Sequence, residues 1–277
     1  MSTKIIIDST VDLPAELRER TRVVPLSVRF GEEEYLDSVT INYQQFYEKL
    51  LTCNDLPCSS QPSPDSFETV YQSITDAGDE AVVLTISSRL SGTYQSACIA
   101  AEEFSNIYVV DTMTAAIAAG VLAQYALKLA DDGLCAKDIA AKLEEEKGNV
   151  RLFAVLDTLE FLKRGGRLSA TAALAGSLLN IKPVITVRDG TIDVVGKARG
   201  LRRGNAMMTE QVGLSGGIDS DRPMMLGFTG LSDELMRAYM SESADLWPAD
   251  VAAAPIGSTI GTHVGPGAYA VAFFCRH

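Results

Sequence analysis

Short runs of β-branched residues alternate with amphipathic helical patterns through the first half of this chain, and this alternation restricts the fold more than any other feature. Strands are predicted at residues 4–7, 22–30, 81–86 and 107–110, and helices at 43–51, 64–77, 93–104 and 115–130. Asp12 lies two residues before Pro14, and we expect its carboxylate to cap a further short helix that begins at this proline. Strands that alternate with helices are typical of a mainly parallel sheet with helices on its faces. We therefore expect an α/β fold.

The second half of the chain is predicted to form an α+β domain. A charged segment at residues 137–147 reads as a solvent-facing helix that precedes the boundary, which gives domains at residues 1–150 and 151–277. Asp189-Gly190 between two β-rich runs predicts a hairpin, so strand pairing here is expected to be more antiparallel. Strands are expected at residues 151–156, 181–187, 191–195, 224–228 and 269–274, and helices at 159–163, 170–179, 201–212 and 233–242.

The charge of the chain argues against nucleic acid as a partner. It has 24 Lys and Arg against 36 Asp and Glu, so its formal net charge of -12 repels phosphate backbones and anionic lipid headgroups. The apolar residues occur in short stretches, well below the roughly 18 residues of a membrane-spanning helix. The apolar stretch near the start is too short for a secretory signal. We expect a cytoplasmic protein without stable membrane insertion.

Metal and cofactor chemistry also finds little support in the sequence. The two histidines, His263 and His277, are too few for a His-based transition-metal site. Neither GxxxxGK[ST] nor GxGxxG after the first strand is present, so a nucleotide-dependent enzyme is disfavoured. We expect no metal and no cofactor. The five cysteines form an odd set without a CxxC pair and are predicted to be reduced: Cys53, Cys58, Cys98, Cys135 and Cys275.

Two hydroxyl-rich segments lie at the starts of predicted helices. Ser91 and Gly92 follow a strand and precede a helix, where free backbone amides favour an anion and a glycine lets it approach closely. The alternative is that Ser91 only caps this helix. In the second segment Ser63 is expected to be the N-cap, which leaves Ser59 and Ser60 for turn hydrogen bonds or for a bound carboxylate.

A histidine and several basic residues add to this set. His263 lies within residues 256–268, which contain four glycines and a proline and are predicted to form a fixed, close-packed loop. With small neighbours, its imidazole can donate a hydrogen bond to a ligand carboxylate. Arg167 and Arg199 belong to a basic bias in an acidic protein. They either complement helix ends or face a phosphate or a partner protein.

Taken together, these motifs resemble the DegV family along nearly the whole chain. The matching elements, in the order of the family, are Asp8-Ser9-Thr10-Val11-Asp12-Leu13, Ser59-Ser60-Gln61-Pro62-Ser63, residues 86–97, Val110-Asp111-Thr112, residues 159–169, Lys197-Ala198-Arg199-Gly200 and Gly261-Thr262-His263-Val264-Gly265-Pro266-Gly267-Ala268. The better-understood members are the fatty-acid-binding subunits of bacterial fatty acid kinase. Ser59 stands where many members have threonine, which keeps the hydroxyl but loses a methyl contact.

The resemblance implies a function and a set of site residues. It implies that a fatty acid lies in an apolar tunnel between the two domains and is presented to a separate kinase subunit, which phosphorylates it to an acyl phosphate. The carboxylate would be held by Ser59, Ser60, Ser91 and His263, with Gly92 beside it. Arg167 and Arg199 match family positions near the site and on the kinase-facing surface. The protein would then be a lipid-binding subunit without catalytic residues of its own.

A serine-dependent lipid or ester hydrolase is the main alternative. Ser91 would be the nucleophile and His263 the base. Ser91 does not lie in a GxSxG motif, no third member is recognisable, and the cluster is better suited to donating hydrogen bonds to an anion.

Overall fold

The first sheet of the computed structural model is parallel and has helices on both faces. The structure describes residues 2–53, 55–168 and 180–276. The strand order is β2-β1-β6-β7, and every neighbouring pair is parallel. These strands are β1 (Thr3–Asp8), β2 (Arg22–Val24), β6 (Glu80–Thr85) and β7 (Ile107–Asp111). The parallel sheet predicted from the alternation is therefore confirmed.

Alternate residues of β1 point to opposite sides of this sheet and so specify both of its cores. Ile6 packs with helices α3 (Pro64–Asp76) and α4 (Thr93–Ala101) on one face. Ile5 and Ile7 pack on the other face, against α5 and α6. Those two helices are α5 (Ala116–Asp131) and α6 (Ala136–Glu146), and the short α1 (Ala15–Arg18) follows β1. A strand with both faces buried reads as a continuous apolar run, as β1 does.

A small antiparallel sheet interrupts the first half and was not predicted in full. The predicted strand at residues 22–30 is broken at Pro25, which has no N–H to donate to a ladder, into β2 and β3 (Ser27–Phe30). β3 pairs with β4 (Glu33–Leu36) and with β5 (Cys58–Ser60). Helix α2 (Tyr43–Thr52) lies between β4 and β5 in the chain. Ser59 and Ser60 thus lie on a strand, and the turn predicted for them is wrong.

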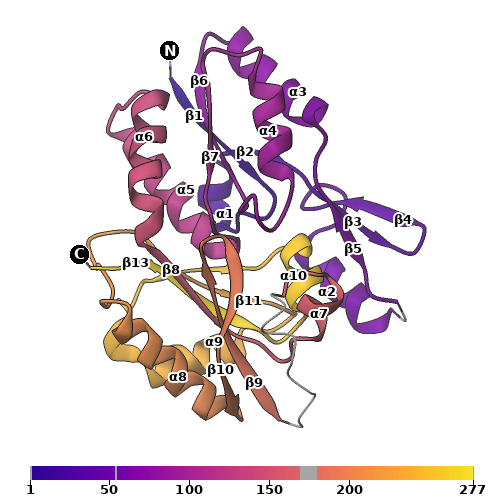
Figure 1. Cartoon of the computed structure of the whole chain (residues 1–277), viewed down its shortest axis with the longest axis vertical. Helices are drawn as coiled ribbons and strands as arrows, with labels where there is room; N and C mark the ends of the chain where they lie inside the picture. Colours follow the sequence, from indigo (N-terminus) through magenta and orange to yellow (C-terminus); the bar gives the residue numbers. More distant parts are fainter. Residues whose placement is uncertain (1, 54, 169–179, 277) are drawn as a thin grey trace.

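The second half of the chain forms a six-stranded sheet in the order β10-β9-β8-β13-β11-β12 (Figure 1). Every pair is antiparallel except β11 with β12. The predicted hairpin is confirmed, and both of its turn residues, Asp189 and Gly190, have positive φ. β12 was not predicted. The strands are β8 (Val150–Val155), β9 (Ile181–Arg188), β10 (Thr191–Arg199), β11 (Met224–Phe228), β12 (Ala252–Pro255) and β13 (Tyr269–Phe274).

Helices α8 (Leu201–Leu214) and α9 (Glu234–Glu242) cover one face of this sheet, and α5 packs on the other face (Figure 1). One hydrophobic cluster therefore contains residues of both halves of the chain, for example Leu122 of α5 and Ala272 of β13. The short helices α7 (Glu160–Arg164) and α10 (Ser258–Val264) contact each other beside the sheet. The predicted helix at residues 170–179 lies outside the described residues. The domain boundary at residue 150 stays a prediction.

Candidate functional site

A cavity of about 340 Å³ is lined by residues from both halves of the chain. Strands β8, β9, β10 and β13 contribute Leu152, Ile185, Ile192 and Ala270, and the other half contributes side chains such as Ile86. Five alanines leave space along the wall: Ala115, Ala116, Ala154, Ala268 and Ala270. The volume lies within the usual range for small-molecule sites, and the wall is mainly aliphatic. Such a cavity suits an apolar chain.

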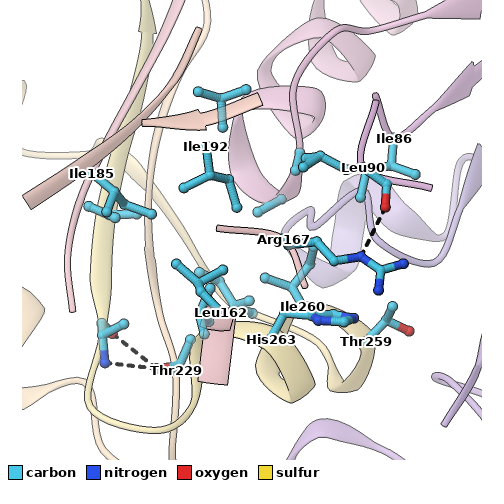
Figure 2. A pocket seen from close by; sticks show the side chains of 18 of the residues that line it. Ile86, Leu90, Leu162, Arg167, Ile185, Ile192, Thr229, Thr259, Ile260 and His263 are labelled. Carbon is cyan, nitrogen blue, oxygen red and sulfur yellow. Dashed lines mark hydrogen bonds between the residues drawn. The ribbon is translucent and has the colours of Figure 1, made fainter. Parts of the chain in front are cut away.

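Polar side chains gather at one end of the cavity, and we call this set the polar end. Figure 2 shows Arg167, His263 and Thr259 on one side of the cavity, with Ile185 and Ile192 on the other. Ser60 is exposed and Ser59 is half-buried, so this end also opens toward solvent. The polar end consists of Ser59, Ser60, Gln61, Ser91, Arg167, Thr259 and His263. The structure therefore brings together Ser59, Ser60, Ser91 and His263.

His263 lies in the last turn of α10, so the loop predicted around it is in part a helix. Its Nε2 is 2.8 Å from the Ser59 hydroxyl, although 204 residues separate the two. Burial, with a further contribution from the positive charge of Arg167, lowers the pKa of His263 to about 4. The imidazole is therefore neutral near pH 7.

The other ring nitrogen indicates which tautomer is present. Nδ1 of His263 is buried, and no residue that the structure describes hydrogen-bonds it. A Cβ on Gly165 would lie only 2.3 Å from this atom, so the Gly165 backbone covers it. An unpaired buried N–H is rarer than an unpaired acceptor, so we assign the proton to Nε2. His263 then donates to the Ser59 oxygen, and the hydroxyl hydrogen of Ser59 stays available for a ligand.

Arg167 supplies the positive charge at the polar end. Its Nε donates to the Leu90 carbonyl at 3.2 Å (Figure 2). Its Nη1 donates to the Gly165 carbonyl at 2.6 Å. These two bonds fix the side chain beside His263. A guanidinium stays charged at all physiological pH values, whereas this histidine does not. An anion at this end of the cavity would therefore meet the charge of Arg167.

Ser91 lines the cavity, and its hydroxyl also accepts the N–H of Thr93, the first residue of α4, at 3.4 Å. The N-cap position of α4 is Gly92, and the Ser91 hydroxyl also lies 2.8 Å from that of Thr93. Gly92 is not among the lining residues; a Cβ there would meet the Gln61 side-chain oxygen at 2.2 Å. Glycine at position 92 thus leaves room for the Gln61 side chain. Arg199 also lies off the cavity wall, exposed at the end of β10.

Two aspartates of the first half hold the helix that carries His263, and we did not predict this role. Asp12 Oδ1 accepts the Gly257 N–H at 2.8 Å. Asp37 accepts the N–H of Ser258 at 3.3 Å and of Thr259 at 2.9 Å. The helix α1 has no side-chain cap, so the capping role predicted for Asp12 is wrong. Burial raises the pKa of Asp12 well above its usual range. In the sequence, Asp12 is only a carboxylate that follows a predicted strand, and nothing near it indicates that its partner is the distant Gly257.

Ser91 and His263 do not form the nucleophile and base pair of a serine hydrolase. His263 pairs with Ser59, whereas Ser91 pairs with Thr93. A hydrolase base also needs an orienting group on its second ring nitrogen, and within the described ranges Nδ1 has none. A pKa of about 4 makes His263 a weak base.

The described part of the chain contains neither a metal-binding cluster nor a helix able to span a membrane. Among the residues the structure describes, no group of three His, Cys, Asp or Glu side chains could hold a metal ion. Over the same residues, every helix is too short or too polar to cross a bilayer.

Comparisons with known proteins agree in family and in fold. A family model described as "Uncharacterised protein, DegV family" matches residues 2–276. A DegV domain-containing protein from Deinococcus radiodurans is 36% identical over 279 residues, which cover 98% of each chain. A structure described as fatty acid binding of a DegV family protein from Thermus thermophilus is 33% identical, with a TM-score of 0.88 over 99% of this chain and 100% of that chain. DegV from Bacillus subtilis, described as a fatty acid binding protein, is 30% identical with a TM-score of 0.85 over 100% of both chains.

Proposed function

Because this chain belongs to the DegV family, we propose that it binds a long-chain fatty acid in the cavity, with the carboxylate at the polar end. The acyl chain would lie among the aliphatic side chains. The observation that carries the proposal is the division of one cavity into an aliphatic wall and an end with hydroxyls and one guanidinium. The two similar structures from Thermus thermophilus and Bacillus subtilis are both described as binding fatty acids.

The aliphatic wall supplies most of the binding free energy in this proposal. Burial of an alkyl chain yields about 0.8 kcal/mol per methylene, so the roughly 14 methylenes of palmitate yield about 11 kcal/mol before the cost of association. Affinity then depends on how much of the chain is enclosed. The polar end contributes orientation, because its hydroxyls and guanidinium stabilise a carboxylate at that end.

The polar end suits a carboxylate because several of its hydrogen-bond donors are available to a ligand. Ser59 can give its hydroxyl hydrogen to the ligand, since its oxygen already accepts from His263. Ser60 and Ser91 add two further hydroxyls, and Arg167 adds the charge. A buried carboxylate without such donors would be costly, whereas charge-assisted hydrogen bonds are short and strong.

We also propose that the bound acid is presented to a separate kinase subunit. A carboxylate oxygen would attack the γ-phosphorus of ATP held by the kinase, forming an acyl phosphate and releasing ADP. The open position of Ser60 supports this, because the carboxylate must be reached from outside. The exposed Arg199 is a candidate contact with the kinase.

Extraction of the purified protein followed by mass spectrometry tests the lipid proposal. A co-purifying fatty acid is expected; a nucleotide would overturn it. Delipidated S91A and H263A should each bind palmitate about tenfold more weakly than the wild type, with unchanged far-UV circular dichroism. S63A is the matched control, because the Ser63 hydroxyl bonds Ser66 and does not line the cavity. Wild-type affinity in both site variants would contradict the site.

The kinase proposal needs a separate assay. The palmitate-loaded protein is mixed with ATP, with and without the catalytic subunit of a bacterial fatty acid kinase, and acyl phosphate is trapped with hydroxylamine. Hydroxamate should form only with the kinase, and R199E should reduce its rate without changing palmitate affinity. Unchanged transfer by R199E would remove Arg199 from the interface. Absence of transfer with active kinases would contradict presentation while leaving lipid binding intact.

A further inference from the structure

Thr259 lines the cavity, and its buried hydroxyl has no hydrogen-bond partner among the residues that the structure describes. The residue is the second of α10 and is only 3% exposed. Its backbone N–H is bonded to Asp37 at 2.9 Å, which fixes the residue in place. Across residues 2–53, 55–168 and 180–276, nothing hydrogen-bonds its Oγ1. A buried hydroxyl without a hydrogen-bond partner lowers the free energy of unfolding. A ligand group that hydrogen-bonds this hydroxyl would remove that destabilisation.

We propose that Thr259 donates a hydrogen bond to the carboxylate of the bound fatty acid. It would be a ligand-binding residue in addition to Ser59, Ser60, Ser91 and His263. This inference rests on the proposed function. Thr259 and His263 are four residues apart, so they lie on the same face of α10 with a rise of about 6 Å between them. Figure 2 places Thr259 beside His263 and Arg167, away from Ile185 and Ile192. A carboxylate bound at the polar end would therefore lie on the same side of the cavity as Thr259.

The neighbouring Thr262 shows what a satisfied threonine on this helix looks like. It is buried as well, but its hydroxyl donates to the Ser258 carbonyl at 2.9 Å. It does not line the cavity. Thr262 therefore provides a control: a buried threonine of the same helix whose hydroxyl is bonded and which lies off the cavity.

Removal of the Thr259 hydroxyl has opposite effects on the empty and on the loaded protein. In T259V the methyl groups keep the volume of the side chain, and the unpaired polar atom is gone. The delipidated variant should therefore melt about 2 °C above the wild type or higher. The loaded variant lacks one charge-assisted hydrogen bond, so palmitate should bind about tenfold more weakly. If Thr259 had only a structural role, its substitution would not raise the melting temperature of the delipidated protein and weaken palmitate binding at the same time.

The experiment measures melting temperature and ligand affinity for delipidated wild type, T259V, T259S and T262V. Palmitate is compared with 1-hexadecanol, whose neutral hydroxyl accepts a weaker hydrogen bond than a carboxylate. We expect T259V to lose about tenfold for palmitate and less than threefold for hexadecanol. T259S should stay within about threefold of the wild type for both, and T262V should bind both normally.

Three outcomes would overturn the assignment. Equal palmitate affinity in T259V and the wild type would remove Thr259 from the site while fatty acid binding stands. Equal losses for palmitate and hexadecanol, or a melting temperature of T259V at or below that of the wild type, would show that the hydroxyl does not act on the carboxylate. Failure of palmitate to bind the wild type would overturn the proposed function and this inference together.

Discussion

The Gly165 backbone covers the buried ring nitrogen of His263, so closely that a Cβ at position 165 would lie 2.3 Å from Nδ1. The same glycine offers its carbonyl to Arg167 Nη1 at 2.6 Å. One residue after α7 thus sets the positions of the two basic side chains at the polar end. Gly165 has an ordinary helical φ of -71°, which any residue can adopt. The reason for glycine here is therefore the close approach to His263 and not the backbone conformation.

Replacement of Gly165 by alanine should therefore damage the site more than the fold. The new methyl group would push the imidazole away and break its bond to the Ser59 hydroxyl. We expect G165A to bind palmitate about tenfold more weakly or worse, as measured by titration of the delipidated protein. G213A is the control, because a Cβ at Gly213 in α8 has open space around it. If G165A binds like G213A, the contact between Gly165 and His263 does not matter for the ligand.

Removal of the Asp37 carboxylate should loosen helix α10. D37A would leave the buried N–H groups of Ser258 and Thr259 without an acceptor, at about 3 kcal/mol of unfolding free energy in total. D37N retains one oxygen and should lose about half as much. Urea denaturation measures both. The control is D65A, at an exposed position in the first turn of α3, where a change below about 1 kcal/mol is expected. A D37A midpoint equal to that of D65A would contradict the anchoring role.

The low pKa of His263 predicts a pH dependence of stability. Its folded pKa of about 4 lies below the ordinary value of 6.5, so between these values the unfolded chain binds the extra proton. The stabilisation is therefore complete above about pH 6.5 and is lost as the pH falls toward 4. Between pH 7 and 5 the wild type should lose roughly 2 kcal/mol more than H263Q, which does not titrate.

This comparison also removes an opposing contribution. Burial raises the pKa of Asp8 from 3.8 to about 6, so this group favours the folded state at low pH and its stabilisation fades as the pH rises. Asp8 is present in both proteins, and the difference between them isolates His263. Denaturation curves at several pH values supply the measurement. Parallel pH profiles for the wild type and H263Q would mean that the imidazole titrates normally in the folded protein.

The fold was predictable where the local pattern is strong. Alternating strands and helices gave the parallel sheet, and Asp189-Gly190 gave the hairpin. β4, β5 and β12 were missed because each is only three or four residues long, too short for a period to show. Helix α10 was missed for another reason. Its glycine-rich sequence disfavours a helix, and the distant acceptors Asp12 and Asp37 hold its first N–H groups.

Several residues of the polar end could be predicted from the sequence, but their contacts could not. Ser59, Ser91 and His263 came from motifs, and all three line the cavity. Sequence alone could not show that His263 pairs with Ser59, because this contact depends on how β5 and α10 meet. Nor could it show that the imidazole is neutral, since burial by the surrounding fold determines its pKa. Thr259 carried no signal, because nothing local distinguishes it from Thr262.

The neutral imidazole makes Arg167 the residue on which the charge of the site depends. R167M keeps much of the side-chain volume and removes the guanidinium, so palmitate should bind at least about tenfold more weakly. The same change removes a positive charge that lowers the pKa of His263, so that pKa should rise from about 4. NMR titration reports this directly, with H263Q used to assign the signal. R188M is the control, because Arg188 is exposed and lies off this cavity. An unchanged affinity together with an unchanged His263 pKa would show that Arg167 neither meets the carboxylate nor acts on the imidazole.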